Sequence, residues 1–244
     1  SAQGWVVNGS SSRSRTYSSE HELVLNADAP LLLKQGDVSR RYTGTLHCVS
    51  LTGEHESAWE LVEHIPVEAY LPGVLVGELY AGWSEACYAA QCVAARSFAC
   101  MQIQQRARHH YDVTDGPSSQ AYHGVVDRSD AHKAQKSTSG VVLAWKGTLV
   151  PGYFSSCCGG RAATATDGIG SSPINDIPPL MGHGDDDYCV NAPLYTWTID
   201  RSARSLGRRI AAKARERSWK KSKALTTIVS IKVETRNIHG RPIT

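Results

Sequence analysis

The sequence predicts an α+β fold, in which a long alanine-rich central helix and a shorter preceding helix pack against antiparallel strands, with a long irregular loop. Three observations lead to this class. Short apolar runs precede residue 65, two helical patterns follow it, and further strand-like segments come after the helices. Because strands and helices do not alternate strictly, the pattern favours a segregated α+β arrangement over a parallel sheet.

The first strands are expected after an irregular lead-in. Residues 1–22 are rich in Ser, Arg and Gly and show no period, so they predict no regular structure. Residues 23–244 are expected to form a single domain. Within 23–51, apolar runs separated by turn residues predict a small sheet, and residues 59–64 predict one more strand.

Two helices are expected next. From Val67 to Leu79, apolar residues recur at three- and four-residue steps, which predicts one apolar helix face, with a kink or restart at Pro72. Ser84 is a suitable N-cap for a second helix that extends to about Arg108. The alanines of this second helix allow close packing on its neighbours.

The C-terminal half is less regular. Residues 141–145 and 149–154 predict two strands, residues 163–193 contain too many Gly and Pro for regular structure, and residues 226–234 alternate like a strand. No stretch is apolar and long enough to predict a membrane span, and no export signal or anchor is recognised in the chain.

The charge is uneven. Residues 201–223 hold ten Lys and Arg against one Glu, a local charge of +9 within a chain whose net charge is +3. Such a basic helical segment is most often a solvated helix face. A partnership with an anionic polymer, including nucleic acid, is the alternative, which we do not favour.

Two charged residues stand out among the helical patterns. Glu78 ends the first apolar run just before a turn, where a half-buried carboxylate can act as a general acid, although a glutamate at a helix end is usually a surface charge. Arg96 is the only charged residue between Glu85 and Arg106, so it requires a partner. We expect it to orient a substrate group or another carboxylate, without a bidentate pair to Glu78.

Several motifs resemble those of one family. Residues 65–74 (IPVEAYLPGV) with 77–79 (GEL) are similar to the L-P-L-E-x-Y-L-x-G-V-V-x-x-E-M-P signature of the SpoIID/LytB family of peptidoglycan lytic transglycosylases. Residues 90–99 (AQCVAARSFA) resemble its A-Q-A-V-A-A-R-T-Y-A segment, and 119–124 (SQAYHG) resemble its S-Q-x-Y-x-G stretch. Residues 153–160 (YFSSCCGG) match its F-x-S-x-x-G-G element.

The resemblance implies cleavage of the MurNAc-GlcNAc β-1,4 bond of glycan strands to a 1,6-anhydro product, without a cofactor. Glu78 stands at the position of the catalytic acid, and Arg96 would support it. Gln120, Tyr122 and Ser155 are candidates for lining the glycan groove, with Tyr122 stacking on a sugar face. The alternative for these three residues is packing in turns and strands.

The sequence departs from the family pattern in two places. Tyr80 replaces the proline that follows the glutamate, and the chain reaches Thr244 without the G-H-G-x-G segment that commonly closes the family's domain. We therefore expect either a fragment or a divergent member.

The cysteines near the long loop allow two interpretations. A Cys158–Cys189 disulfide would tether the loop in an exported protein. Zinc held by Cys158, Cys189 and His183 is the alternative, but Cys157 and Cys158 are adjacent and lack the spacing typical of zinc sites. We favour the disulfide.

The resemblance implies an extracytoplasmic protein of the periplasm or cell wall, with glycan strands and other wall hydrolases as partners. The alternative function is a non-catalytic module that binds the wall or modifies its hydrolases.

Overall fold

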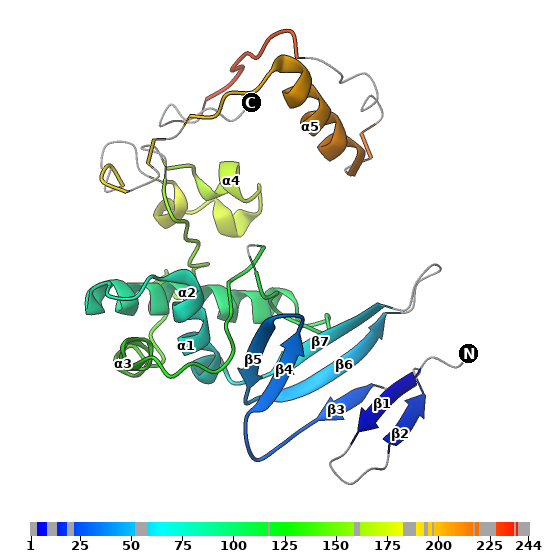
Figure 1. The fold of residues 1–244 in the computed structure, drawn as a ribbon. Helices are drawn as coiled ribbons and strands as arrows, with labels where there is room; N and C mark the ends of the chain where they lie inside the picture. Colours follow the sequence, from blue (N-terminus) through cyan, green and yellow to red (C-terminus); the bar gives the residue numbers. More distant parts are fainter. Residues whose placement is uncertain are drawn as a thin grey trace. The chain divides into compact units, whose positions relative to one another are not determined.

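The computed structural model describes residues 4–8, 14–18, 22–51, 58–116, 118–158, 162–182, 189–192, 195–196, 198–216, 218–219, 228–236 and 238. The chain divides into two compact units, Ser1–Phe154 and Ser155–Thr244. The single family-like domain expected over 23–244 stays a prediction. The α+β class is confirmed, because the described residues form helices and antiparallel strand pairs (Figure 1).

The first unit begins with strands. Strands β1 (Gly4–Asn8) and β2 (Ser14–Ser18) pair antiparallel, so the lead-in that was expected to be irregular contains a strand pair. Strands β3 (Leu23–Leu25), β6 (Thr45–Leu51) and β7 (Ala58–His64) form an antiparallel sheet in the order β3-β6-β7. Between β3 and β6, strands β4 (Leu31–Gln35) and β5 (Val38–Tyr42) form a second pair. These strands supply the sheet surface predicted for residues 23–64.

The helices of this unit form one packed group. Helix α1 (Val67–Glu78) continues through Pro72 without a restart, and the residues around the proline, Leu71 and Gly73, are buried. Burial of this turn offsets the backbone hydrogen bond that the proline removes. Helix α2 (Glu85–Gln105) begins at Ser84, whose Oγ accepts a hydrogen bond from the Cys87 N–H at 3.3 Å, as predicted for its N-cap. Helix α3 (Ser129–Ser137), which the sequence did not reveal, packs on both.

The core lies where this helix group meets the sheets. Alanines on one face of α2 allow α1 and α3 to approach closely, while Tyr42 and Leu46 contribute from the strands. The buried members of the core are Tyr42, Leu46, Tyr70, Leu71, Val74, Leu75, Tyr88, Cys92, Ala95, Ala99, Tyr122, Ala131 and Ala134.

The segments after α3 contain less regular structure than the sequence predicted. The strands expected over 141–145 and 149–154 are limited to β8 (Ala144–Trp145) and β9 (Thr148–Leu149). Residues 228–234 form no strand, although their sequence alternates. An alternating pattern needs a neighbouring strand to complete its hydrogen bonds, and the described part of the chain offers none there.

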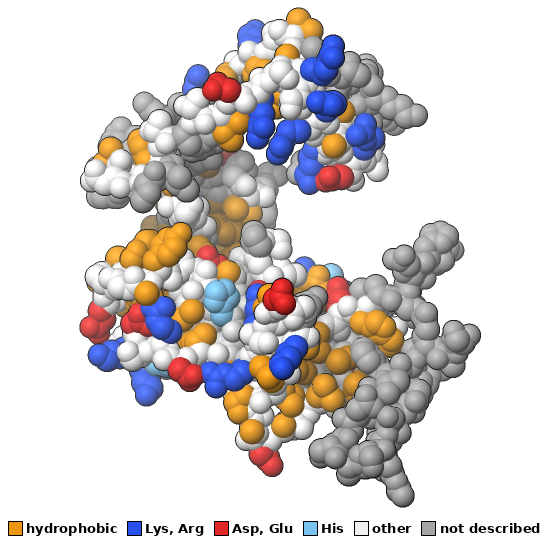
Figure 2. Space-filling view, viewed as in Figure 1, with side chains coloured by type: hydrophobic (Ala, Val, Ile, Leu, Met, Phe, Trp, Pro, Cys, Tyr) orange, Lys and Arg blue, Asp and Glu red, His pale blue; other side chains and the backbone are white. Residues whose placement is uncertain are grey.

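The second unit is mostly irregular. It contains the short helix α4 (Ala165–Gly168), the 3-10 turns Pro173–Asn175 and Pro178–Leu180, and helix α5 (Ala203–Glu216). Buried Gly207, Ala211 and Ala214 form one face of α5, while Lys and Arg side chains gather on its exposed surface (Figure 2). Helix α5 therefore confirms a helix within the predicted basic segment 201–223.

Candidate active site

Glu78 is the last residue of α1, and its carboxylate is half-buried. Its Oε1 accepts a hydrogen bond from the Ala121 backbone N–H at 2.6 Å. Its Oε2 makes no hydrogen bond to any residue that the structure describes. One oxygen of the carboxylate is therefore anchored, while the other has no partner among the described residues.

The segment that anchors Glu78 lies directly against α1. A Cβ atom on Gly77 would approach the carbonyl oxygen of Ala121 to 2.5 Å, and a Cβ on Gly73 would collide with Tyr122 and Gly124. The His123 N–H also donates to the Gly73 carbonyl oxygen at 3.2 Å. Two glycines one turn apart thus let residues 120–124 approach the helix backbone, which brings the Ala121 N–H to Glu78.

Gln120 is buried within this segment, and both ends of its amide have protein partners. Its Oε1 accepts from the Tyr70 hydroxyl at 3.1 Å, and its Nε2 donates to the Ala95 carbonyl oxygen at 3.3 Å. Burial raises the pKa of Tyr70, and the charges of Asp115 and Glu78 act in the same direction, so Tyr70 stays a neutral donor. The Gln120 side chain, which is 0% exposed, supports the segment from within and offers no group to a groove.

Tyr122 is also largely buried. Its ring lies 4.8 Å from that of Tyr70 and 6.3 Å from that of Tyr42, centroid to centroid, and its hydroxyl donates to Glu63 Oε2 at 2.7 Å. Burial and this hydrogen bond raise the pKa of Tyr122 above its usual value. Only 7% of Tyr122 is exposed, so the structure favours packing over the predicted stacking on a sugar.

Asp115 supports the same segment and was not singled out from the sequence. Its Oδ1 accepts from the Tyr122 N–H at 3.3 Å, and its Oδ2 forms an ion pair with Arg40 of β5. Asp115 and Tyr122 also line a pocket of about 790 Å³ that is bounded by strands β5 to β7, the end of α2 and residues 109–115. Glu78 is not among its lining residues, so this pocket is separate from the carboxylate.

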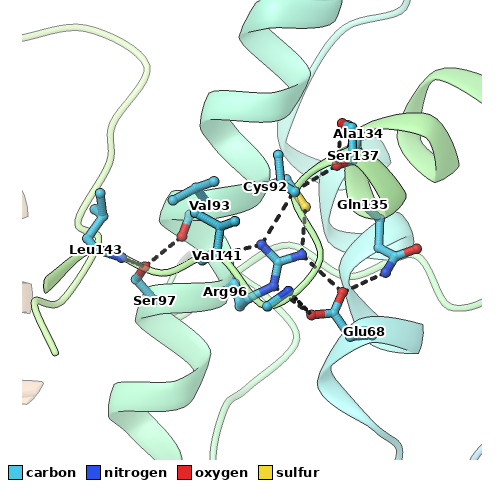
Figure 3. Close-up of polar contacts among 12 residues, drawn as sticks. Glu68, Cys92, Val93, Arg96, Ser97, Ala134, Gln135, Ser137, Val141 and Leu143 are labelled. Atoms are coloured by element: carbon cyan, nitrogen blue, oxygen red, sulfur yellow. Dashed lines mark hydrogen bonds and ion pairs between the residues drawn. The ribbon is translucent and has the colours of Figure 1, made fainter.

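Arg96 is buried and forms a bidentate pair with Glu68 (Figure 3). Its Nε and Nη2 donate to Glu68 Oε1 and Oε2 at 2.8 and 3.0 Å, and its Nη1 donates to the Val141 carbonyl oxygen at 3.0 Å. The expectation of another carboxylate is met, and no contact joins Arg96 to Glu78 among the described residues. Among the described residues, Arg96 therefore does not contact Glu78 and does not support it directly.

Glu68, the partner of Arg96, was not predicted from the sequence. It also accepts from Gln135 Nε2 at 2.6 Å and from the Gly140 N–H at 3.2 Å. The side-chain hydrogen bonds from Arg96 lower the pKa of Glu68 to about 2, despite the opposing effect of burial. The signal was present, because Glu68 is the glutamate of the P-V-E-A-Y motif and a buried arginine needs a carboxylate.

Ser155 belongs to the second unit, where it is exposed and its Oγ donates to the Cys157 carbonyl oxygen at 3.5 Å. Its place in a glycan groove stays a prediction.

The cysteines of the second unit lie close together. Cys158 Sγ and Cys189 Sγ are 3.8 Å apart, longer than a disulfide bond of about 2.05 Å. His183, the third predicted zinc ligand, lies outside the described residues. Within the described ranges, no group of three or more His, Cys, Asp or Glu could hold a metal ion. The disulfide stays a prediction.

A segment of the first unit matches a known protein family. Residues 55–145 match the family described as "SpoIID: Stage II sporulation protein", and this segment includes α1, Glu78, α2 and the segment 120–124. This match confirms the resemblance that was recognised from the motifs.

Two curated relatives extend the comparison. An uncharacterized protein of Brachyspira hyodysenteriae is 26% identical over 236 residues, which are 91% of this chain and 62% of that protein. The amidase enhancer of Bacillus subtilis is 30% identical over 149 residues, which are 61% of this chain and 19% of that protein. The chain thus spans less than two thirds of either relative. None of the helices in the described ranges is both long and apolar enough to cross a membrane.

Proposed function

We propose that this chain acts on the bacterial cell wall as a lytic transglycosylase, cleaving the MurNAc-GlcNAc β-1,4 bond of glycan strands. The main support for this proposal is the hydrogen bonding of the Glu78 carboxylate. Its Oε1 accepts from the Ala121 N–H, and its Oε2 has no partner among the described residues. The SpoIID family match over 55–145 supports the same substrate class. An extracytoplasmic location follows from that substrate.

In the proposed reaction, one carboxyl group serves twice. Glu78 Oε2 carries the proton and transfers it to the glycosidic oxygen as the bond from C1 of MurNAc to that oxygen breaks. The resulting carboxylate faces an oxocarbenium-like centre. It then removes the proton of the C6 hydroxyl of the same sugar while O6 forms a bond to C1. The products are a free GlcNAc hydroxyl and a 1,6-anhydro-MurNAc end, and Glu78 is again protonated.

This route explains why a single carboxylate is enough. Hydrolytic glycosidases position a second carboxylate to activate water or to form a covalent intermediate, whereas here the attacking hydroxyl belongs to the substrate. The Arg96–Glu68 pair would contribute indirectly, as a positioning pair that holds α1 against α2 and thereby fixes the direction in which Glu78 leaves the helix.

The test is mass spectrometry of purified glycan strands after incubation with the wild-type chain and with Glu78→Gln. The proposal expects 1,6-anhydro ends from the wild type and a loss of at least about 100-fold in the variant, the contribution typical of general acid-base groups. Glu216→Gln, which removes an exposed carboxylate in α5, is the matched control and should retain activity. Equal product from Glu78→Gln would rule out the proposed acid.

A second function is supported by one relative. Because the Bacillus subtilis protein is named an amidase enhancer, the chain could bind the wall and stimulate another hydrolase without cutting it. Release of stem peptides by a purified wall amidase, measured with and without the chain, tests this function. Stimulation that is equal for the wild type and Glu78→Gln, with no anhydro ends from either, would favour the modifier role.

A further inference from the structure

The turn between α1 and α2 exposes two aromatic side chains immediately after Glu78. Tyr80 is 79% exposed and Trp83 is 50% exposed, and their ring centroids lie 6.2 Å apart with the planes tilted by 55°. Consecutive Cα atoms are about 3.8 Å apart, so the Tyr80 backbone lies within about 8 Å of that of Glu78. Two large rings are therefore presented to solvent beside the candidate acid.

The turn that carries these rings is held in place at several points. The Tyr80 carbonyl oxygen accepts from the hydroxyl of fully buried Tyr88 at 3.1 Å. Gly82 adopts a φ of 84°, a left-handed conformation that glycine adopts without strain. Ser84 then caps α2. The rings are thus displayed on a structured turn, which reduces the entropy lost when a ligand binds.

Exposed aromatic pairs of this kind suit a ligand with flat apolar faces and polar edges. Single exposed apolar residues are common, but grouped ones mark binding sites. The Tyr hydroxyl and the Trp indole N–H add polar contacts at the ring edges. Pyranose rings match this pattern, since their C–H faces are apolar and their hydroxyls lie around the edge.

The local charge distinguishes a glycan from a nucleic acid. Nucleic-acid platforms combine stacking rings with Lys and Arg that hold the phosphates. Residues 77–87 contain Glu78 and Glu85 and no Lys or Arg, and Arg128, which donates to the Tyr88 hydroxyl, is paired with Asp130. The two carboxylates of this segment would repel a phosphate backbone, whereas the N-acetylglucosamine rings of a glycan strand carry no charge.

We propose that Tyr80 and Trp83 form a sugar-binding platform, here called the turn platform, which stacks on the pyranose rings of a β-1,4-linked N-acetylated amino-sugar chain next to Glu78. This inference rests on the proposed function for its choice of substrate. It assigns to the turn platform the stacking role that buried Tyr122 cannot perform. Tyr80 occupies the position where the family signature has proline, so the platform distinguishes this chain from that signature.

Binding measured without cleavage tests the turn platform. In the Glu78→Gln background, isothermal titration calorimetry with soluble β-1,4-linked N-acetylglucosamine oligomers is compared with the same titration of Tyr80→Ala and Trp83→Ala. Each ring removed should weaken binding by about tenfold, the order of a lost aromatic contact. Trp83→Phe should retain most of the affinity, because it keeps a stacking face.

Trp219→Ala is the matched control, since Trp219 is 55% exposed and belongs to the second unit. Unchanged melting temperatures would show that the variants remain folded. Binding that is equal for the parent and both alanine variants, or no binding by the parent, would overturn the turn platform. Binding of single-stranded DNA that is lost in Tyr80→Ala and Trp83→Ala, with binding of the sugar oligomers unchanged, would also overturn it. Because this titration needs no catalysis, absence of anhydro ends from the wild type would overturn the proposed function and leave the platform intact.

Discussion

Two glutamates of α1 have different environments, although both lie in the motif that resembles the SpoIID signature. Glu68, in the first turn, is engaged by Arg96, Gln135 and the Gly140 N–H. Glu78, in the last turn, has one anchored oxygen and one without a described partner. A carboxylate saturated with donors is suited to holding structure, whereas one with an open oxygen is suited to proton transfer.

Glu68→Gln should destabilise the first unit. Arg96 is 2% exposed, and removing its counter-charge leaves a buried cation unpaired. The Glu68 side chain is 38% exposed, so solvent screening reduces the loss to about 2 kcal/mol of unfolding free energy, below the full cost of a broken buried pair. Urea unfolding followed by circular dichroism measures the loss. Glu85→Gln, at the exposed start of α2, is the control and should cost about 0.5 kcal/mol.

The same pair predicts a pH dependence. Because the folded state lowers the pKa of Glu68 from 4.5 to about 2, the unfolded state binds the proton more readily, and acid favours unfolding. The stabilisation is complete above about pH 4.5 and is lost as the pH falls toward about 2. The difference in unfolding free energy between the wild type and Glu68→Gln should therefore shrink between about pH 7 and about pH 3. A constant difference would show that Arg96 does not stabilise the charged form.

Helix α1 and the segment 120–124 pack closely against each other, and together they position Glu78. Gly73 and Gly77 remove side chains from the helix face on which the segment lies, and Gln120 and Asp115 hold the segment from the other side. The position of the Ala121 N–H, and hence of Glu78 Oε1, depends on this close contact.

Gly77→Ala should disrupt the contact. The added Cβ would lie 2.5 Å from the Ala121 carbonyl oxygen and 2.9 Å from its carbonyl carbon, both backbone atoms that cannot move away alone. We expect a loss of about 1–3 kcal/mol in stability from overpacking, together with reduced formation of anhydro ends. Gly168→Ala is the control, because its Cβ would meet only the Ala163 Cβ at an ordinary 3.5 Å. Full activity and stability of Gly77→Ala would contradict the proposed role of the glycines.

Helices α1 and α2 could be predicted because their apolar spacing and the Ser84 cap are local signals. The burial of Gln120 and Tyr122 could not be predicted in the same way. A polar residue in a turn is usually exposed. Burial of Gln120 depends on hydrogen bonds with the Tyr70 hydroxyl and the Ala95 carbonyl oxygen, and burial of Tyr122 depends on the Glu63 carboxylate. These partners are far away in the sequence and are brought close only by the tertiary structure. Helix α3 was missed because its sequence is polar and its two buried alanines give a weak pattern.

The two compact units of the molecule contain different parts of the predicted site. The first unit contains the segment 55–145 that matches the SpoIID family, and the described hydrogen bond that holds Glu78. The second unit contains Ser155, the neighbouring cysteines and the basic face of α5. The division at Phe154 was not predictable from composition, because residues 153–160 form a continuous family-like motif that crosses it.

In the proposed reaction, Glu78 alone transfers the protons and no water is consumed. Its most direct test is to digest glycan strands in water enriched in oxygen-18 and to weigh the released ends by mass spectrometry. We expect unlabelled 1,6-anhydro ends from the wild type and none from Glu78→Gln. Newly formed reducing ends that carry oxygen-18 at the earliest time points, before exchange of the anomeric oxygen with water, would show hydrolysis. Anhydro ends in equal amount from Glu78→Gln would show a different acid. Either result would rule out the role proposed for Glu78.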